Sequence, residues 1–159
     1  MAAAGATPEP FLGGLQIRRP ATLDAAACAL LEAKNVCTVC TRAGDGTIHA
    51  QPVWVDTDGE AVLLNSVPGR AWVRNVERDP RVTCTTVNLQ NPYEFLEVRG
   101  RAELRGGEAG ERHIHELSKK YLGLDAYPFS SPDEPRVLIA VVPERIVHVE
   151  PEAEDLDSD

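Results

Sequence analysis

The chain has 159 residues, of which 43% are hydrophobic and 26% charged, and its formal net charge is -9. These are ordinary values for one globular domain, and they exclude a fibrous or wholly disordered chain. An acidic chain without a basic stripe lacks the charge pattern that binds a phosphate backbone, so we expect no nucleic-acid partner. No apolar run is long enough for a membrane span or a secretory signal, so we expect a cytoplasmic protein with no membrane partner.

The two ends of the chain differ in composition from its middle. Residues 1–21 are rich in Ala, Pro and Gly, and we expect a flexible N-terminal segment there. Residues 151–159 are acidic with few apolar side chains, so we expect a disordered tail, with Glu150 also part of the solvated end. One folded domain is expected over residues 22–150.

Between these ends, a few helices alternate with many short β-rich runs. Apolar faces at helical spacing predict helices over 22–35, with Thr22 as the cap, 68–78, and 107–122, which ends at Gly123. Strands are predicted over 36–42, 48–56, 60–67, 81–88, 93–104, and 136–149 with a break at 143–145. Tight turns and the lack of long crossovers favour an antiparallel barrel of about six strands with flanking helices, a mainly β (α+β) fold.

Cysteine and histidine do not predict a metal centre. Cys37 and Cys40 have the spacing of a redox or zinc motif, but residues three apart on a strand point to opposite faces, so buried, reduced thiols are expected. His113 and His115 lie two apart on a helix and cannot share a metal, so solvated positions are expected for both. His148 stands alone in a strand, where a structural role is expected.

No activated serine and no pair of carboxylates is visible either, so the catalytic residues stay unassigned. This composition suits a cofactor enzyme, in which the protein mainly binds and orients the reactants.

The strand-to-helix junction near Arg70 is the most informative stretch. A helix N-terminus offers unpaired N–H groups and a partial positive charge, and both bind phosphate. Arg70 and Arg74 lie one turn apart on one face, and Asn65 and Ser66 precede the helix as hydrogen-bond donors. They form a candidate anion cradle, with two solvated arginines as the alternative. Trp72 is either a core residue or a platform for a ring.

Four stretches in a fixed order carry a family resemblance. They are QPVW at 51–54; GRA, RN and RDPRV within 69–82; NPY and LEVRGR within 91–101; and Ile114 followed by ELSKKYLG at 116–123. With them the chain resembles the pyridoxamine 5′-phosphate oxidase-like proteins, in the branch of reductases that use the deazaflavin coenzyme F420. The resemblance covers roughly residues 25–149. It implies a split β-barrel of the FMN-binding type that forms a homodimer, with a cofactor in each of two grooves between the subunits.

Carried over by position, the resemblance implies that one group of residues lines the cofactor ring, namely Gln51, Pro52 and Val53. Asn65 and Ser66 would meet its ribityl or phosphate part. The phosphate itself would be held by Arg70, Ala71, Arg74 and Asn75, while Asn91 and Tyr93 would come from the other subunit.

The resemblance implies transfer of hydride from reduced F420 to an electron-poor double bond of a small organic molecule. Trp72 stands where the family often has a lysine, two residues after Arg70, so its stacking on the ring system is one possibility. The same departure leaves two alternatives open: an FMN-dependent oxidase or reductase on the same fold, and a non-catalytic protein that holds a flavin, deazaflavin or haem.

Overall fold

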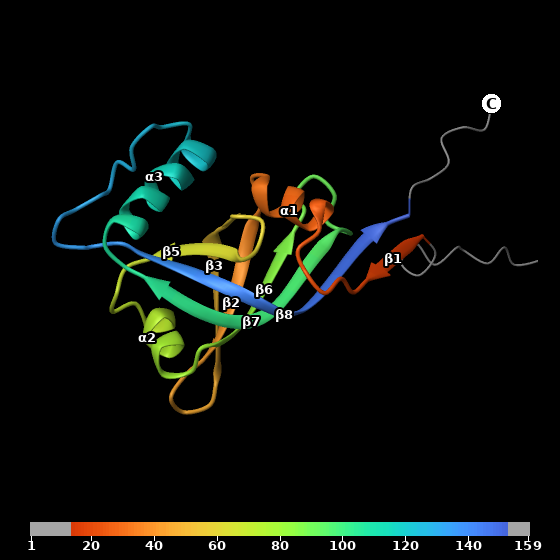
Figure 1. The fold of residues 1–159 in the computed structure, drawn as a ribbon, viewed down its shortest axis with the longest axis horizontal. Helices are drawn as coiled ribbons and strands as arrows, with labels where there is room; N and C mark the ends of the chain where they lie inside the picture. Colours follow the sequence, from red (N-terminus) through yellow and green to blue (C-terminus); the bar gives the residue numbers. More distant parts are fainter. Residues whose placement is uncertain (1–13, 153–159) are drawn as a thin grey trace, which may run out of the picture.

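The computed structural model describes residues 14–152, and within them the chain forms one antiparallel sheet of eight strands with three helices (Figure 1). The split-barrel prediction is confirmed. In chain order the elements are β1 Leu15–Arg18, α1 Ala25–Glu32, β2 Val36–Arg42, β3 Ile48–Trp54, β4 Asp56–Thr57, β5 Val62–Ser66, α2 Ala71–Arg78, β6 Arg81–Val87, β7 Phe95–Arg105, α3 Glu108–Leu122 and β8 Val137–Pro151.

The order of the strands forces the sheet to curl. Its hydrogen-bonded path runs β3-β2-β6-β7-β8-β5-β4, so β3 and β4 lie at the two ends of the path. In the sequence, however, these two strands are separated only by Val55. A flat sheet cannot hold both ends together, so the path closes into a barrel. No ladder joins β3 to β5 in the described strands, which leaves a seam between them.

Strand β8 is the longest strand of the barrel, and it has as many residues as helix α3. It pairs with β7 along most of its length, and its other edge pairs with β5 at one end and with β1 at the other. The predicted break at residues 143–145 is wrong, because the strand continues through a register shift opposite Arg99 and Gly100. A bulge accommodates Pro143, which lacks a backbone donor for a regular ladder.

The N-terminal prediction also needs correction. Part of the segment expected to be flexible forms β1, whose pairing partner lies more than a hundred residues away and leaves no local signal. The first helix starts later than predicted, since Asp24 rather than Thr22 is its N-cap and accepts from the Ala27 amide at 2.9 Å. Glu150 belongs to β8, not to a solvated tail. Residues 1–13 and 153–159 of the two predicted ends lie outside the described part of the chain.

The core lies on both faces of the sheet. Val137, Ile139 and Val141 of β8 belong to the main cluster inside the barrel, whereas Leu138 and Ala140 belong to a second cluster. Alternate residues of a strand point to opposite faces, so the second cluster lies outside the barrel. Helix α3 packs against β8 and β5. The helix comes close to the sheet at Gly110, where a Cβ would overlap the Arg136 carbonyl.

Two further predictions concern cysteine and the membrane. Cys37 points into the core and Cys40 to the other face, as predicted, but Cys40 is half-buried rather than buried. The cysteines of the described residues carry free thiols. Between residues 14 and 152, no helix has the length and apolar character needed to cross a membrane.

The bulge between β7 and β8 provides a test of the packing. We expect Gly100→Ala to lower the free energy of unfolding by about 1–3 kcal/mol or more, because its Cβ would overlap the Val142 carbonyl and the backbone would have to shift. Gly106→Ala is the matched control, since nothing lies within 4 Å of its Cβ, and it should change stability by less than about 0.5 kcal/mol. Urea unfolding followed by circular dichroism measures both; equal stabilities would contradict the packing at the bulge.

Candidate functional site

Two adjoining cavities lie at the seam between β3 and β5. The first, called the polar cavity below, has a volume of about 340 Å³ and the second, called the apolar cavity, about 400 Å³. They share Val53, Tyr127 and Arg136. The polar cavity is also lined by His49, Gln51, Ser66, Val67, Arg70, Ala71 and Trp72. The apolar cavity is also lined by Val36, Pro52, Trp54, Asn65, Ile114 and Leu117.

Most of the predicted site residues meet at this seam although they come from β3, β5, α2 and the turn before α2. The lining residues that were predicted are Gln51, Pro52, Val53, Asn65, Ser66, Arg70, Ala71 and Trp72. Trp72 is a core residue, since its side chain is only 4% exposed, and it also lines the polar cavity; its role as a platform for a ring stays a prediction.

The other predicted residues lie elsewhere in this subunit. Arg74 is exposed on α2 and lines neither cavity. Asn75 is buried; its amide donates to the Thr41 hydroxyl at 3.1 Å and accepts from Arg78 at 2.9 Å, so it is engaged in holding α2 against β2. Asn91 and Tyr93 lie in the turn before β7 and also line neither cavity. A role for them across a subunit boundary stays a prediction.

The N-terminus of α2 lies beside the polar cavity. The predicted helix start at residue 68 is wrong, because Pro68 and Gly69 form a turn in which the Arg70 amide bonds to the Val67 carbonyl at 3.3 Å. Gly69 has a φ of 94°, which suits the third position of such a turn. Arg70 is the N-cap, but its side chain forms no capping bond. The first amides of α2 therefore keep their capacity to bind an anion.

Arg136 is a site residue that the sequence reasoning missed. Its side chain lines both cavities, its Nε donates to Asn65 Oδ1 at 2.9 Å, and its guanidinium lies 5.4 Å from the centre of the Tyr127 ring. Burial lowers the pKa of Arg136. No carboxylate in the described part of the chain lies within ion-pair distance of it. The only signal in the sequence is a basic residue before an apolar strand, which is too common to identify a site.

Asn65 links Arg136 to helix α3. Its Nδ2 donates to the Gly110 carbonyl at 3.0 Å and to His113 Nδ1 at 3.2 Å. Since Nδ1 accepts, the proton of the neutral ring is on Nε2, which has no hydrogen-bond partner in the described residues. The predicted solvated position of His113 is wrong, because the residue is only 2% exposed, and this burial lowers its pKa to about 4.

The end of α3 fixes the other wall of the seam. The Tyr121 hydroxyl donates to the Asn35 carbonyl at 2.6 Å and accepts from the Val55 amide at 3.1 Å. Lys120 Nζ donates to the Val55 carbonyl at 2.6 Å. The Tyr121 ring also stacks on Trp54, with centroids 5.0 Å apart and planes within 3°. Trp54 is thus held in place on the wall of the apolar cavity.

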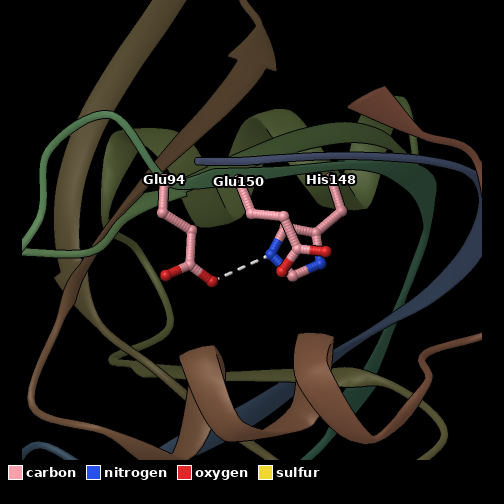
Figure 2. A group of neighbouring side chains, drawn as sticks. All are labelled: Glu94, His148 and Glu150. Carbon is pink, nitrogen blue, oxygen red and sulfur yellow. Dashed lines mark hydrogen bonds and ion pairs between the residues drawn. The ribbon is translucent and has the colours of Figure 1, made fainter. Parts of the chain in front are cut away.

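A second polar cluster lies where β1 meets β8. Glu94, His148 and Glu150 place one side-chain atom each within 4.8 Å of one another (Figure 2). His148 is fully buried, and its Nε2 lies 3.0 Å from Glu94 Oε1 while its Nδ1 lies 3.1 Å from Arg18. Arginine can only donate, so Nδ1 accepts from Arg18 and Nε2 donates to Glu94. Both ring nitrogens are therefore occupied by protein groups.

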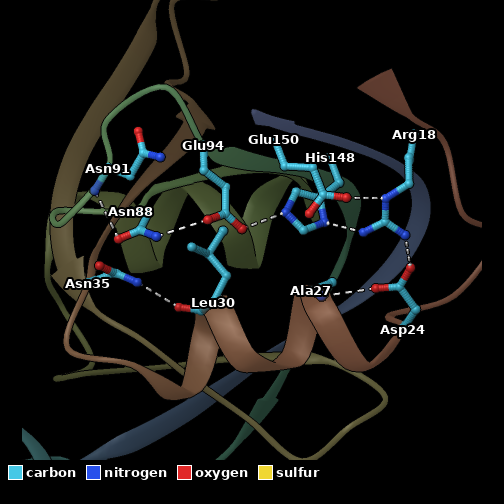
Figure 3. A network of polar contacts seen from close by, with 10 residues as sticks. All are labelled: Arg18, Asp24, Ala27, Leu30, Asn35, Asn88, Asn91, Glu94, His148 and Glu150. Carbon is cyan, nitrogen blue, oxygen red and sulfur yellow. Dashed lines mark hydrogen bonds and ion pairs between the residues drawn. The ribbon is translucent and has the colours of Figure 1, made fainter. Parts of the chain in front are cut away.

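Arg18 is the centre of this cluster (Figure 3). Besides His148, it pairs with Glu150 and with Asp24, each at 2.6 Å, and Asp24 also caps α1. The pKa of Asp24 is lowered despite some desolvation. The hydrogen bond from the Ala27 amide contributes most to this shift, and the bond from Arg18 also favours the carboxylate. The structural role predicted for His148 fits this network, which joins β1, α1 and β8, although the side chain does not stand alone.

Comparisons with known proteins agree with this geometry. Residues 23–150 match the sequence profile of the family described as pyridoxamine 5′-phosphate oxidase. A solved structure named F420 Reductase is 29% identical, with a TM-score of 0.64 over 74% of this chain and 93% of its own. A Listeria innocua protein provisionally assigned as a pyridoxamine 5′-phosphate oxidase is 28% identical, with a TM-score of 0.60 over 74% of this chain and 90% of its own.

One more distant structure, the conserved hypothetical protein Rv2991 from Mycobacterium tuberculosis, shares the fold at 19% identity and a TM-score of 0.61 over 77% of this chain and 81% of its own. No curated protein sequence matches the chain.

The buried His113 predicts a loss of stability in weak acid. Its pKa is 6.5 in the unfolded chain and about 4 in the fold, so the unfolded state takes up the proton first as the pH falls. The expected loss between these two pH values is up to about 3 kcal/mol, at roughly 1.4 kcal/mol per pKa unit. Urea unfolding from pH 7 to pH 4 should show a smaller loss for His113→Gln, whereas the half-buried control His49→Gln should keep the original slope. Identical slopes for all three proteins would contradict the burial of His113.

Proposed function

This chain belongs to the pyridoxamine 5′-phosphate oxidase family, and we propose that it is an F420-dependent oxidoreductase. Its reaction would transfer hydride from the reduced deazaflavin to one carbon of an electron-poor double bond in a small organic molecule, and the other carbon would take up a proton from solvent or a nearby side chain. The relative named F420 Reductase supports this choice of cofactor, because the likeness extends over 74% of this chain. The observation that carries the proposal is the polar cavity, where an uncapped helix N-terminus, Ser66 and Arg70 come together.

These residues fit a phosphorylated cofactor. Arg70 supplies a positive charge, and the first amides of α2 supply donors that no side chain caps. Gln51 and Val53 lie on the β3 side of the same cavity, where the ring of a cofactor would follow its phosphate. The phosphate would thus contact the side of the cavity formed by Ser66, Arg70 and α2, and the ring would contact the β3 side, in the order that a flavin-like molecule requires.

The chemistry would depend on position more than on acid or base groups. When bound, a reduced deazaflavin supplies a hydride. The described lining of the two cavities contains no carboxylate, thiol or amine, and its one imidazole, that of His49, borders the polar cavity. The protein's contribution would be to hold the donor and acceptor carbons in contact and to exclude water with Val53, Trp54 and Leu117, which can supply much of a rate enhancement.

An FMN-dependent oxidase or reductase is the second candidate. The Listeria innocua protein, provisionally assigned as a pyridoxamine 5′-phosphate oxidase, favours it at nearly the same identity and with the same share of this chain covered. In either case the polar cavity would bind the phosphate, so the two candidates differ in the ring of the cofactor and not in the group that anchors it.

Titration of the purified protein with F420 and with FMN tests the proposal. We expect F420 to quench the fluorescence of Trp54 and Trp72, which both line the cavities, and to bind more tightly than FMN. Arg70→Gln should weaken binding about tenfold or more, because it removes a charge-assisted hydrogen bond to phosphate. Arg112→Gln, an exposed arginine on α3, is the matched control and should bind like the unchanged protein.

The outcomes separate the candidates. Tight binding of FMN alone would establish the flavin enzyme instead, and tight F420 binding without turnover on a broad set of electron-poor acceptors would favour a carrier. Failure of both cofactors to bind would disprove the proposal.

We also propose that the protein is a homodimer. In the described chain, α3 packs on β5 and β8, whereas a hollow of about 650 Å³, called the open face below, lies over β2, β3, β6 and β7. On the outer surface Ile48 is 68% exposed, Val142 41% and Val36 39%. Burying such a surface against a second copy would supply part of the roughly 1,200–2,000 Å² that a stable interface needs.

Light scattering after size-exclusion chromatography tests the dimer. Ile48→Glu should shift the mass toward the monomer, because it would bury an unpaired charge in the proposed interface. Leu124→Glu is the control: this leucine is 46% exposed but follows α3, away from the open face, and its variant should keep the original mass. A monomeric unchanged protein would refute the homodimer.

A further inference from the structure

The apolar cavity contains one charged side chain among the described residues, Arg136. Its other walls are mostly apolar or aromatic and come mainly from β3 and α3, with the Asn65 amide as a second polar group; Ile114 and Leu117 are only 2% and 1% exposed. The Trp54 ring is held by its stacking on Tyr121, and the Tyr127 ring meets Trp54 edge-on at 6.1 Å. Such flat, fixed walls favour a planar ligand, because aromatic rings gain most from stacked or edge-on contact.

Arg136 forms no ion pair among the described residues, although Glu111 and Glu134 are near enough to interact with its charge. The residue is half-buried. Of its side-chain nitrogens, only Nε forms a hydrogen bond in the described chain. Half-burial makes an unpaired charge somewhat costly, and a guanidinium whose terminal N–H groups have no protein partner in the described chain matches the two oxygens of a carboxylate. This arginine therefore suits an anionic ligand.

Asn65 holds this arginine in a defined position. The Asn65 amide is itself fixed, because its oxygen accepts from Arg136 and its nitrogen donates to Gly110 and His113. The fork of Arg136 is therefore set before any ligand arrives, and less entropy is lost on binding.

The phosphate of the cofactor is not the best partner for Arg136. In the polar cavity, Ser66, Arg70 and the N-terminus of α2 already provide an anion site. Arg136 borders that cavity but also reaches the apolar one, which holds no other charged group in the described residues.

We propose that the apolar cavity is the subsite for the hydride acceptor, and that the acceptor is a planar conjugated or aromatic molecule whose carboxylate pairs with Arg136. The identification of this ligand as the acceptor rests on the proposed function. The recognition of a planar carboxylate at Arg136 does not depend on it.

The test compares two probes that differ in charge, 2-naphthoate and its neutral isostere 2-naphthamide, by calorimetric titration of the full chain. The unchanged protein should bind 2-naphthoate about tenfold more tightly, because a charge-assisted hydrogen bond contributes that much. A protein that binds both probes equally would overturn the proposal without any variant.

Variants locate the effect. Arg136→Gln should abolish the preference for the carboxylate while leaving 2-naphthamide binding unchanged, and Arg136→Lys should retain part of the preference because it keeps the charge and loses the fork. Arg70→Gln is the matched control, since it removes the same charge from the polar cavity only, and it should keep the full preference. A preference that persists in Arg136→Gln would overturn the proposal.

A last arm separates the substrate from the cofactor as the source of the anion. In protein saturated with F420, 2-naphthoate should still bind with its preference, which supports a separate acceptor subsite. Displacement of 2-naphthoate by F420, together with an equal loss of F420 affinity in Arg136→Gln and Arg70→Gln, would assign Arg136 to the cofactor phosphate and overturn the proposal. If neither F420 nor FMN binds but the preference persists, the proposed function fails and the carboxylate subsite stands.

Discussion

The short connection between β3 and β4 is the constraint on which the rest of the structure depends. These strands end the path of the sheet but are joined by Val55 alone, so the sheet has to close. Its closure is held by side chains rather than by a ladder, since Lys120 and Tyr121 bind the backbone of Val55. The seam is therefore free of strand pairing at β3 and β5, and a space remains there. Pro52 suits this position, because an edge strand tolerates a residue without an amide donor.

The polar groups around the seam follow from that open edge. Asn65 comes from β5, Arg136 from the start of β8 and His113 from α3, yet one set of hydrogen bonds joins them. Each group is buried to some degree, so each needs a partner or carries a cost. Both polar atoms of the Asn65 side chain have protein partners, whereas among the described residues His113 Nε2 and the terminal nitrogens of Arg136 have none, and of these two side chains Arg136 lines the cavities. The N–H groups of Arg136 are thus available at the cavities before a ligand binds.

The network around Arg18 serves the opposite end of the barrel. Its charges are mutually paired, and both nitrogens of His148 are engaged. Neighbouring carboxylates and a histidine resemble a metal site in composition, but the guanidinium occupies the place of a cation. The contrast with Arg136 shows that the pairing of a charge, rather than its presence, distinguishes a structural cluster from a candidate binding site.

The sequence by itself determined the alternation that makes β2 and β6, the apolar face of α3 and its end at Gly123, and, through the family resemblance, the group of residues from Gln51 to Trp72 that meets at the seam. These signals are local, because side-chain periodicity and turn chemistry act over a few neighbouring residues. Only the tertiary structure decided that Leu15–Arg18 is a strand, that His113 is buried and that Arg136 joins the site. Each of these depends on a partner far away in the chain: β8 for the strand, β5 for the histidine, and Asn65 for the arginine. No local pattern encodes such pairings, since the same residue types are equally common on an exposed surface.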